Sequence, residues 1–147
     1  MIVEPAGTPD LASIHVLLRS AKLPSVDIRH AHLSHFRVVR TRGCADVIGV
    51  VGLEPYPPVG LLRSLAVAPT QRGAGIGATL VAAIEVLAHS QGIDELVLLT
   101  TTAERFFERL GYRKAARTGV PASLQSTSEF AELCPASAIC MIKNIQA

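Results

Sequence analysis

Apolar residues recur along the first part of the chain with the period of a helix. They stand three or four residues apart, at Leu11, Ile14, Leu17, Leu18 and Ala21. Thr8 and Pro9 are typical of an N-cap followed by a first-turn proline, and residues 22–24 end the pattern. The apolar residues form one face of this helix, which is expected to be buried against a sheet. A short strand at 2–6 is expected before the helix.

The next segments show the shorter period of strands. Residues 36–41 and 45–53 are β-rich runs joined by Arg42 and Gly43, which predicts a hairpin. A third strand is expected over 61–68, beyond a proline-rich turn. The polar segment 25–35 between the first helix and this meander is expected to be a short helix or a loop.

The second half predicts a longer helix followed by alternating elements. Residues 75–91 carry apolar side chains at helical spacing, and Gly92 stands where a left-handed C-terminal residue is expected. A strand at 95–101, a helix at 103–110 and a strand from Tyr112 onward indicate a β-α-β unit. A small helix near 128–133 and a last strand over 138–145 complete a mixed α/β (α+β) fold.

Composition and charge narrow the class of protein. The chain has 147 residues, of which 49% are hydrophobic, so one domain spanning 1–147 can bury a core without metal or disulfides. The net charge is only +2 and the basic residues are scattered along the chain, which argues against a nucleic-acid-binding surface. No apolar run is long enough to span a membrane. Three cysteines (Cys44, Cys134, Cys140) without a CxxC pair, and the lack of a signal-peptide pattern, predict a reducing cytoplasm.

Residues 65–77, with the sequence LAVAPTQRGAGIG, carry the clearest chemical signal. A strand leads through a proline into a glycine-rich loop, which runs directly into the longest predicted helix. Glycines let the backbone approach an anion closely, and the free amides and dipole of a helix start favour negative charge. The loop lacks the lysine of a P-loop, and it does not follow the first strand as a dinucleotide-binding loop would. It predicts a pyrophosphate site.

The loop and a second motif resemble the GCN5-related N-acetyltransferases. Arg72, Gly75 and Gly77 match the family's pattern of Gln or Arg, two residues, Gly, one residue, and Gly or Ala. The stretch FFERLGYRKA, from Phe106, looks like its helix-to-strand signature. The resemblance implies a mostly antiparallel, mixed sheet of six or seven strands with about four helices. It also implies acetyl-CoA as co-substrate and a small-molecule amine as acceptor.

The same resemblance assigns roles to positions of this chain. In the family, the strand before the loop bulges and splays from its neighbour, and its backbone pairs with pantetheine. The implied contacts with acetyl-CoA are made by Leu65, Ala66, Val67, Arg72, Gly73, Ala74, Gly75, Ile76, Gly77, Thr100 and Phe107. Phe107 stands where many members carry a tyrosine that protonates the departing thiolate, so this general acid is missing.

The amine must lose a proton before it can attack a thioester, because an ammonium has no lone pair. Glu54 is the leading candidate base, and the alternative is an ion pair with Arg63 across adjacent strands. Ser64 is a second catalytic candidate. Three loop histidines, His30, His32 and His35, have suitable pKa values but no evident carboxylate partner. No metal site is expected.

Two further stretches of sequence bear on the identity of the acceptor amine. The stretches GLEPY and LLRSLAV resemble N-acetylglutamate synthase domains and the small arsenic-resistance N-acetyltransferases, and the run from 117 to 143 resembles the arsenic-associated branch. This implies a glutamate-like amino acid or an analogue such as phosphinothricin or arsinothricin. Arg63 and Arg117 are the candidate partners of its carboxylate, with Arg109 for a second acidic group.

Other interpretations remain open. Cys134 and Cys140 are candidates for binding trivalent arsenic, although packing residues of this kind are common. Because Phe107 replaces the family's tyrosine, a CoA-binding sensor or partner-binding module without turnover is one alternative. A protein N-terminal acetyltransferase is another, and a homodimer is possible.

Overall fold

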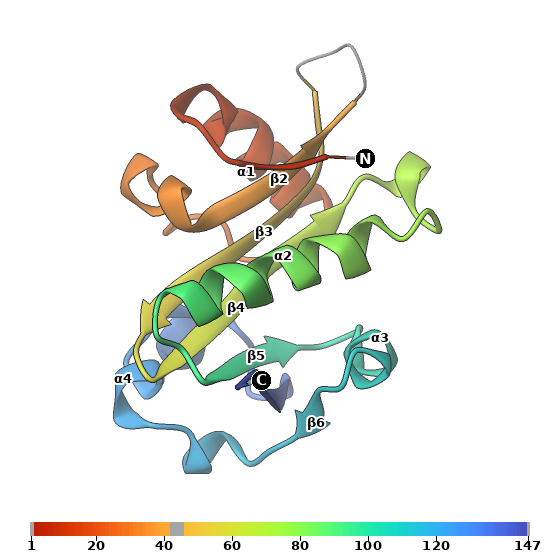
Figure 1. Cartoon of the computed structure of the whole chain (residues 1–147). Helices are drawn as coiled ribbons and strands as arrows, with labels where there is room; N and C mark the ends of the chain where they lie inside the picture. The colour runs from red at the N-terminus through yellow and green to blue at the C-terminus, as the bar shows by residue number, and fades with distance from the viewer. Residues whose placement is uncertain (1, 42–45, 147) are drawn as a thin grey trace.

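A seven-stranded sheet forms the centre of the protein (Figure 1). The computed structural model describes residues 2–41 and 46–146. The strands are β1 (Val3–Pro5), β2 (Phe36–Arg40), β3 (Val47–Tyr56), β4 (Val59–Val67), β5 (Glu95–Thr100), β6 (Arg113–Lys114) and β7 (Ile139–Asn144). Their order is β1-β2-β3-β4-β5-β7-β6, and every neighbouring pair is antiparallel except β4 and β5. The predicted mixed, mostly antiparallel sheet is confirmed.

Helices cover both faces of this sheet. They are α1 (Leu11–Ser20), α2 (Ile76–Ser90), α3 (Glu104–Arg109) and α4 (Ala122–Gln125). The long helix α2 crosses one face in front of β3 and β4, where Leu80 and Ile84 pack in one apolar cluster with Leu53 (Figure 1). On the opposite face, α1 packs against β2 and β3, and α4 packs against β4, β5 and β7. None of the helices in the described residues is long and apolar enough to cross a lipid bilayer.

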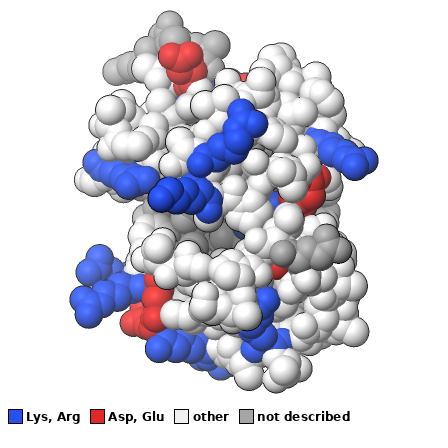
Figure 2. Space-filling view, turned by 180° about the vertical axis from the view of Figure 1, so that it is seen from behind, with Lys and Arg blue, Asp and Glu red and all other residues white. Residues whose placement is uncertain are grey.

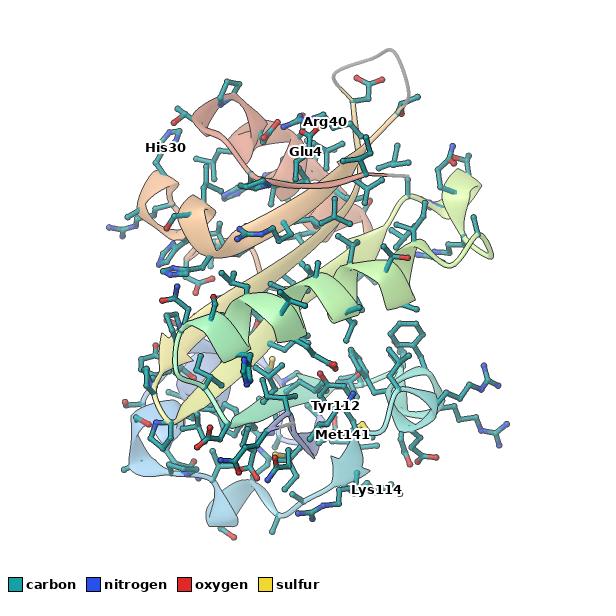
Figure 3. All side chains as sticks on the ribbon, in the orientation of Figure 1. Glu4, His30, Arg40, Tyr112, Lys114 and Met141 are labelled. Carbon is teal, nitrogen blue, oxygen red and sulfur yellow. The ribbon has the colours of Figure 1, made fainter. Side chains whose placement is uncertain are left out.

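The start of the first helix differs from the sequence prediction. Thr8 is not the N-cap: a single 3-10 turn over Thr8–Asp10, capped by Gly7, precedes α1, and Asp10 is the N-cap of α1 itself. The Asp10 carboxylate accepts a hydrogen bond of 2.7 Å from the Gly7 backbone N–H. The same carboxylate pairs with Arg40 of β2 at 2.6 Å, and Arg40 also pairs with Glu4, beside which it lies in Figure 3. A tertiary ion pair therefore fixes where this helix begins.

The predicted β-α-β unit near the C-terminus is wrong. The strand after α3, β6, pairs with β7 and not with β5, because β7 lies between them. The side chains explain this order: Cys140 and Met141 of β7 are buried, as a central strand requires, whereas Arg113 and Lys114 of β6 are exposed at the edge. Helix α4 was not predicted, and the expected small helix is a π-helical turn over Glu129–Leu133. The predicted β2–β3 turn at Arg42 and Gly43, and Cys44, lie outside the described residues.

Gly52 of β3 leaves room for the tip of the Phe36 ring. A Cβ atom at position 52 would stand 2.5 Å from Phe36 Cζ, and Phe36 is buried. Gly52→Ala is therefore expected to lower the free energy of unfolding by about 1–3 kcal/mol, as overpacked core substitutions do. Urea denaturation measures this. Gly119→Ala is the control, because its Cβ meets nothing within 4 Å, and an equal loss in both variants would contradict the packing argument.

Candidate active site

Strands β4 and β5 diverge along their length, and this divergence creates the site. They pair at only three positions, and the last pair is Leu61 with Val97. On its other side β4 continues beside β3, but the register shifts between Val50 and Gly52. Ser64 lies at this bulge with a φ of 62°. The bulge turns β4 away from β5, so the second half of each strand faces a gap.

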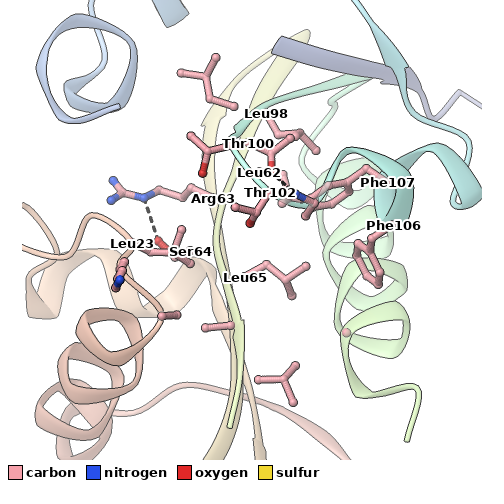
Figure 4. Close-up of a pocket in the computed structure, with 18 of the residues that line it drawn as sticks. Leu23, Leu62, Arg63, Ser64, Leu65, Leu98, Thr100, Thr102, Phe106 and Phe107 are labelled. Carbon is pink, nitrogen blue, oxygen red and sulfur yellow. Dashed lines mark hydrogen bonds between the residues drawn. The ribbon is translucent and has the colours of Figure 1, made fainter. Parts of the chain in front are cut away.

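A cavity of about 570 Å³ fills this gap. Its walls come from the second half of β4, the loop before α2, the end of β5 and the start of α3, with residues 21–24 and several residues of 129–138 closing the other side. A hollow is visible near the middle of the face shown in Figure 2, with Lys and Arg side chains above and below it. In Figure 4, Arg63 and Ser64 project to one side of β4, while Phe106 and Phe107 lie on the opposite side of the pocket.

The glycine-rich loop forms one end of the cavity. Gly73 and Gly75 have φ values of 87° and 78°, a left-handed conformation that residues with a side chain rarely adopt. In the described part of the chain, no group accepts a hydrogen bond from the backbone N–H of residues 72–75. The first amides of α2 are also free of intrahelical partners, as at every helix start. Together with the exposed Arg72, these donors suit a phosphate-rich ligand.

Almost all the residues predicted to contact the cofactor line this cavity. They are Leu65, Ala66, Val67, Arg72, Gly73, Gly75, Ile76, Gly77, Thr100 and Phe107. Ala74, which was also predicted to contact the cofactor, is not part of the described lining. Phe107 is buried and packs edge-on against Phe106 and Tyr112, with centroid distances of 5.1 and 5.4 Å. The Tyr112 hydroxyl donates to Glu85 on α2, so it does not replace the missing tyrosine at position 107.

A cluster of ion pairs lies at the opposite wall of the cavity, which it lines through Arg63 and Glu129. Arg63 is 4% exposed and donates to both oxygens of Asp27, at 2.6 and 2.8 Å, and to Glu54 at 2.7 Å. Its Nε lies 3.0 Å from Ser64 Oγ and 3.2 Å from Glu129 Oε2. We call Asp27, Glu54, Arg63 and Glu129 the Arg63 cluster. It lies between the two apolar clusters on the α1 face of the sheet.

The pKa values of Asp27 and Glu129, two carboxylates of the Arg63 cluster, are shifted in opposite directions. Burial alone would raise the pKa of Asp27, but the hydrogen bonds and charge of Arg63 lower it overall. Burial raises the pKa of Glu129 to about 7; Arg63 opposes this rise, and the charges of Glu54 and Asp27 add to it. Burial, together with the Glu129 charge, raises the pKa of the neighbouring Cys134 thiol to about 12. At neutral pH, Glu129 is the group in this wall that is poised to gain or lose a proton.

Of the residues predicted to act in catalysis or to bind the substrate, some line the cavity and others do not. Ser64 and Arg63 line the cavity. Glu54 is not part of the described lining, and both of its oxygens are engaged: one accepts a hydrogen bond from Tyr56 at 2.7 Å and the other from Arg63. The predicted alternative, an ion pair between Glu54 and Arg63, is present. Arg117 also lies outside the described lining; it donates to the carbonyls of Phe130 and Pro135 and so fastens the C-terminal segment.

Further predicted residues are absent from the cavity wall. None of the three loop histidines, His30, His32 and His35, is among the described residues that line it, nor is Arg109 at the end of α3. Cys134 lines the cavity and Cys140 is buried on β7. Two charged residues of the described lining, Lys22 and Glu129, were not identified as site residues from the sequence. Glu129 belongs to the Glu-Phe pair of the C-terminal motif, but only the fold brings it beside Arg63.

Residues 32–114, more than half of the chain, match the family model described as the acetyltransferase (GNAT) domain. The protein belongs to the GNAT family. It is 33% identical over 91 residues to an amino-acid acetyltransferase of Ralstonia nicotianae; the match covers 60% of this chain and 20% of that protein. A further match, 33% identical over 91 residues, is to an uncharacterized N-acetyltransferase of Chlorobaculum tepidum, and it covers 61% of this chain and 57% of that protein. The matched region thus spans between a fifth and somewhat more than half of the length of these relatives.

Solved structures show that the GNAT fold extends over the whole chain. N-acetylglutamate synthase from Neisseria gonorrhoeae, complexed with coenzyme A and N-acetyl-glutamate, superposes with a TM-score of 0.84 at 21% identity. That likeness covers 99% of this chain and 35% of the synthase. A Mycobacterium tuberculosis protein in complex with CoA gives a TM-score of 0.82 at 22% identity and covers 98% of this chain and 99% of that one. At these identities the likeness establishes the shared fold.

Proposed function

We propose that this GNAT domain transfers an acetyl group from acetyl-CoA to the amine of a small molecule. The observation that carries the proposal is the cavity between the diverging β4 and β5, which joins the glycine-rich loop at one end to the Arg63 cluster at the other. Free loop amides suit the pyrophosphate of acetyl-CoA. The β4 edge at Leu65, Ala66 and Val67 has lost its β5 partner, so its backbone groups can pair with the pantetheine amides.

Acetyl-CoA supplies a thioester whose carbonyl carbon the amine attacks. The bulge at Ser64 separates the pantetheine-binding edge from the Arg63 cluster, so the acetyl group is expected near this residue. Phe107 offers no proton to the departing thiolate. A thiolate is a moderately good leaving group, since the thiol pKa is roughly 8.5, and the proton released by the attacking amine can neutralise it.

For the acceptor, we propose an amino acid or an amino-acid analogue. The matches to amino-acid acetyltransferases support this class. Because Arg63 already holds the carboxylates of Asp27 and Glu54, a substrate carboxylate is better served by Lys22, the exposed cation on the same side of the cavity. Glutamate, phosphinothricin and arsinothricin are the acceptors to test, and a role in arsenic resistance would follow only from the last of them.

The proposal is tested by thiol release from acetyl-CoA with amino acids, phosphinothricin-type analogues, simple amines and short peptides. Acetyl-CoA binding is measured beside it by calorimetry. We expect binding, and turnover on a small amine that bears a carboxylate. Binding without turnover on any acceptor would instead support a CoA-binding sensor, and turnover confined to peptides would support a protein N-terminal acetyltransferase. Loss of turnover in Lys22→Met, with acetyl-CoA affinity retained, would support the carboxylate contact.

A further inference from the structure

The carboxylate of Glu129 has an unusual position in the cavity wall. The residue is 4% exposed, yet it lines the cavity together with Ser64 and Cys134. It lies on the C-terminal segment, whose backbone Arg117 holds by its hydrogen bond to the Phe130 carbonyl. A buried carboxylate that borders the cavity exchanges protons most readily with whatever the cavity contains.

Of the three carboxylates in the Arg63 cluster, Glu129 has the longest contact with the guanidinium. Both oxygens of Asp27 accept hydrogen bonds from Arg63, and both oxygens of Glu54 are engaged, by Arg63 and Tyr56. Glu129 lies farther from the guanidinium, with its Oε2 3.2 Å from Arg63 Nε, and this Nε also donates to Ser64 Oγ at 3.0 Å. The other hydrogen-bond partner of the Glu129 carboxylate is the Cys134 thiol. Three carboxylates around one guanidinium leave an excess of negative charge, which favours a proton or an ammonium group beside Glu129.

We propose that Glu129 accepts the proton that the substrate amine loses before it attacks acetyl-CoA. This inference rests on the proposed function and adds the base of that reaction. One proton passes from the ammonium to the carboxylate, and the freed nitrogen lone pair forms the C–N bond with the thioester carbon. The C–S electron pair leaves with the sulfur, which takes the second nitrogen proton. The third proton stays on the amide, and Glu129 returns its proton to solvent.

The groups around Glu129 set its pKa in a range that suits a general base. The charged and titratable groups that face it are Arg63 on β4, Glu54 on β3, Asp27 on the segment after α1, and Cys134 beyond the π-helical turn. Burial and the two acidic neighbours bring its pKa to about 7, close to the optimum for general base catalysis at neutral pH. The Cys134 thiol, with a pKa of about 12, stays protonated and does not compete. Because the reaction needs the carboxylate form, turnover should rise with pH through about 7.

The test is the pH profile of kcat and kcat/KM for the best acceptor, measured for the wild type and for Glu129→Gln. We expect the variant to lose about 100-fold in kcat near neutral pH, at the lower end of general base effects. The acidic limb near pH 7 should disappear, while acetyl-CoA affinity stays unchanged. The deficit should shrink at alkaline pH, where a larger share of the amine is already neutral. Glu129→Asp should recover part of the activity.

Two further variants separate the base from its neighbours. Glu95→Gln makes the same change at the start of β5, outside the cavity lining, and should behave as the wild type. Glu54→Gln should keep an acidic limb, shifted because one charge beside Glu129 is gone. An acidic limb near pH 7 that survives in Glu129→Gln, or that vanishes in Glu54→Gln alone, would overturn the role of Glu129. A wild type without turnover on any amine would overturn the proposed function, and this role with it, whereas failure of the role alone leaves wild-type turnover intact.

Discussion

Replacing Gly75 by glutamate is expected to weaken acetyl-CoA binding by about 100-fold or more, from two effects that add. The left-handed conformation at this residue, with φ of 78°, costs a residue with a side chain roughly 1–2 kcal/mol. The new carboxylate also stands in the loop whose free amides are proposed to hold the pyrophosphate, where like charges repel. A Cβ at Gly75 meets no atom within 4 Å, so the fold itself should survive.

Calorimetric titration with acetyl-CoA measures this effect, and two controls separate its causes. Gly75→Ala carries the backbone strain without the charge, so its loss of affinity should be smaller. Gly119→Glu adds the same charge at an ordinary backbone conformation, outside the described lining of the cavity, and should bind as the wild type does. Unaltered affinity in Gly75→Glu would remove the loop from the acetyl-CoA site.

The second large effect is expected at Arg63. Arg63→Met keeps much of the apolar length of the side chain but leaves three carboxylates without their shared cation. Removing one partner from a buried ion pair costs about 3–5 kcal/mol, and we expect a loss of this size in the free energy of unfolding at mildly alkaline pH. Lys114→Met is the control: Lys114 is 62% exposed in its pair with Glu104, and loss of a surface pair costs about 1 kcal/mol or less.

The loss in Arg63→Met should depend on pH, with a sign that follows from the pKa shifts. In the wild type the pKa of Asp27 is lowered, so its contribution to stability is present above its unfolded pKa and disappears as the pH falls. Without Arg63, burial raises the pKa values of Asp27 and Glu129 above their unfolded values, so the variant is stabilised as these two groups protonate. The difference between wild type and variant should therefore shrink at mildly acidic pH. Chemical denaturation at several pH values measures it, and a difference independent of pH would contradict this account.

The amino-acid sequence determined the features that depend on near neighbours in the chain. The spacing of apolar residues predicted α1 and α2, the β-rich runs predicted β2, β3 and β4, and the backbone conformation of Gly92 was predicted correctly. The glycine-rich loop was recognisable because a strand, flexible residues and a helix start must follow one another directly to expose free amides. Most of the residues expected at acetyl-CoA therefore line one cavity.

Only the tertiary structure decided the features that depend on contacts between distant parts of the chain. The order of β5, β7 and β6 depends on which strand can be buried on both faces, and the start of α1 depends on the pairing of Asp10 with Arg40. Glu54 and Arg63 were predicted as possible partners because their strands adjoin, but Asp27 and Glu129 reach the same guanidinium from segments without a regular apolar period. The pKa of Glu129 follows from that assembly, because burial and neighbouring charge exist only once the chain has folded.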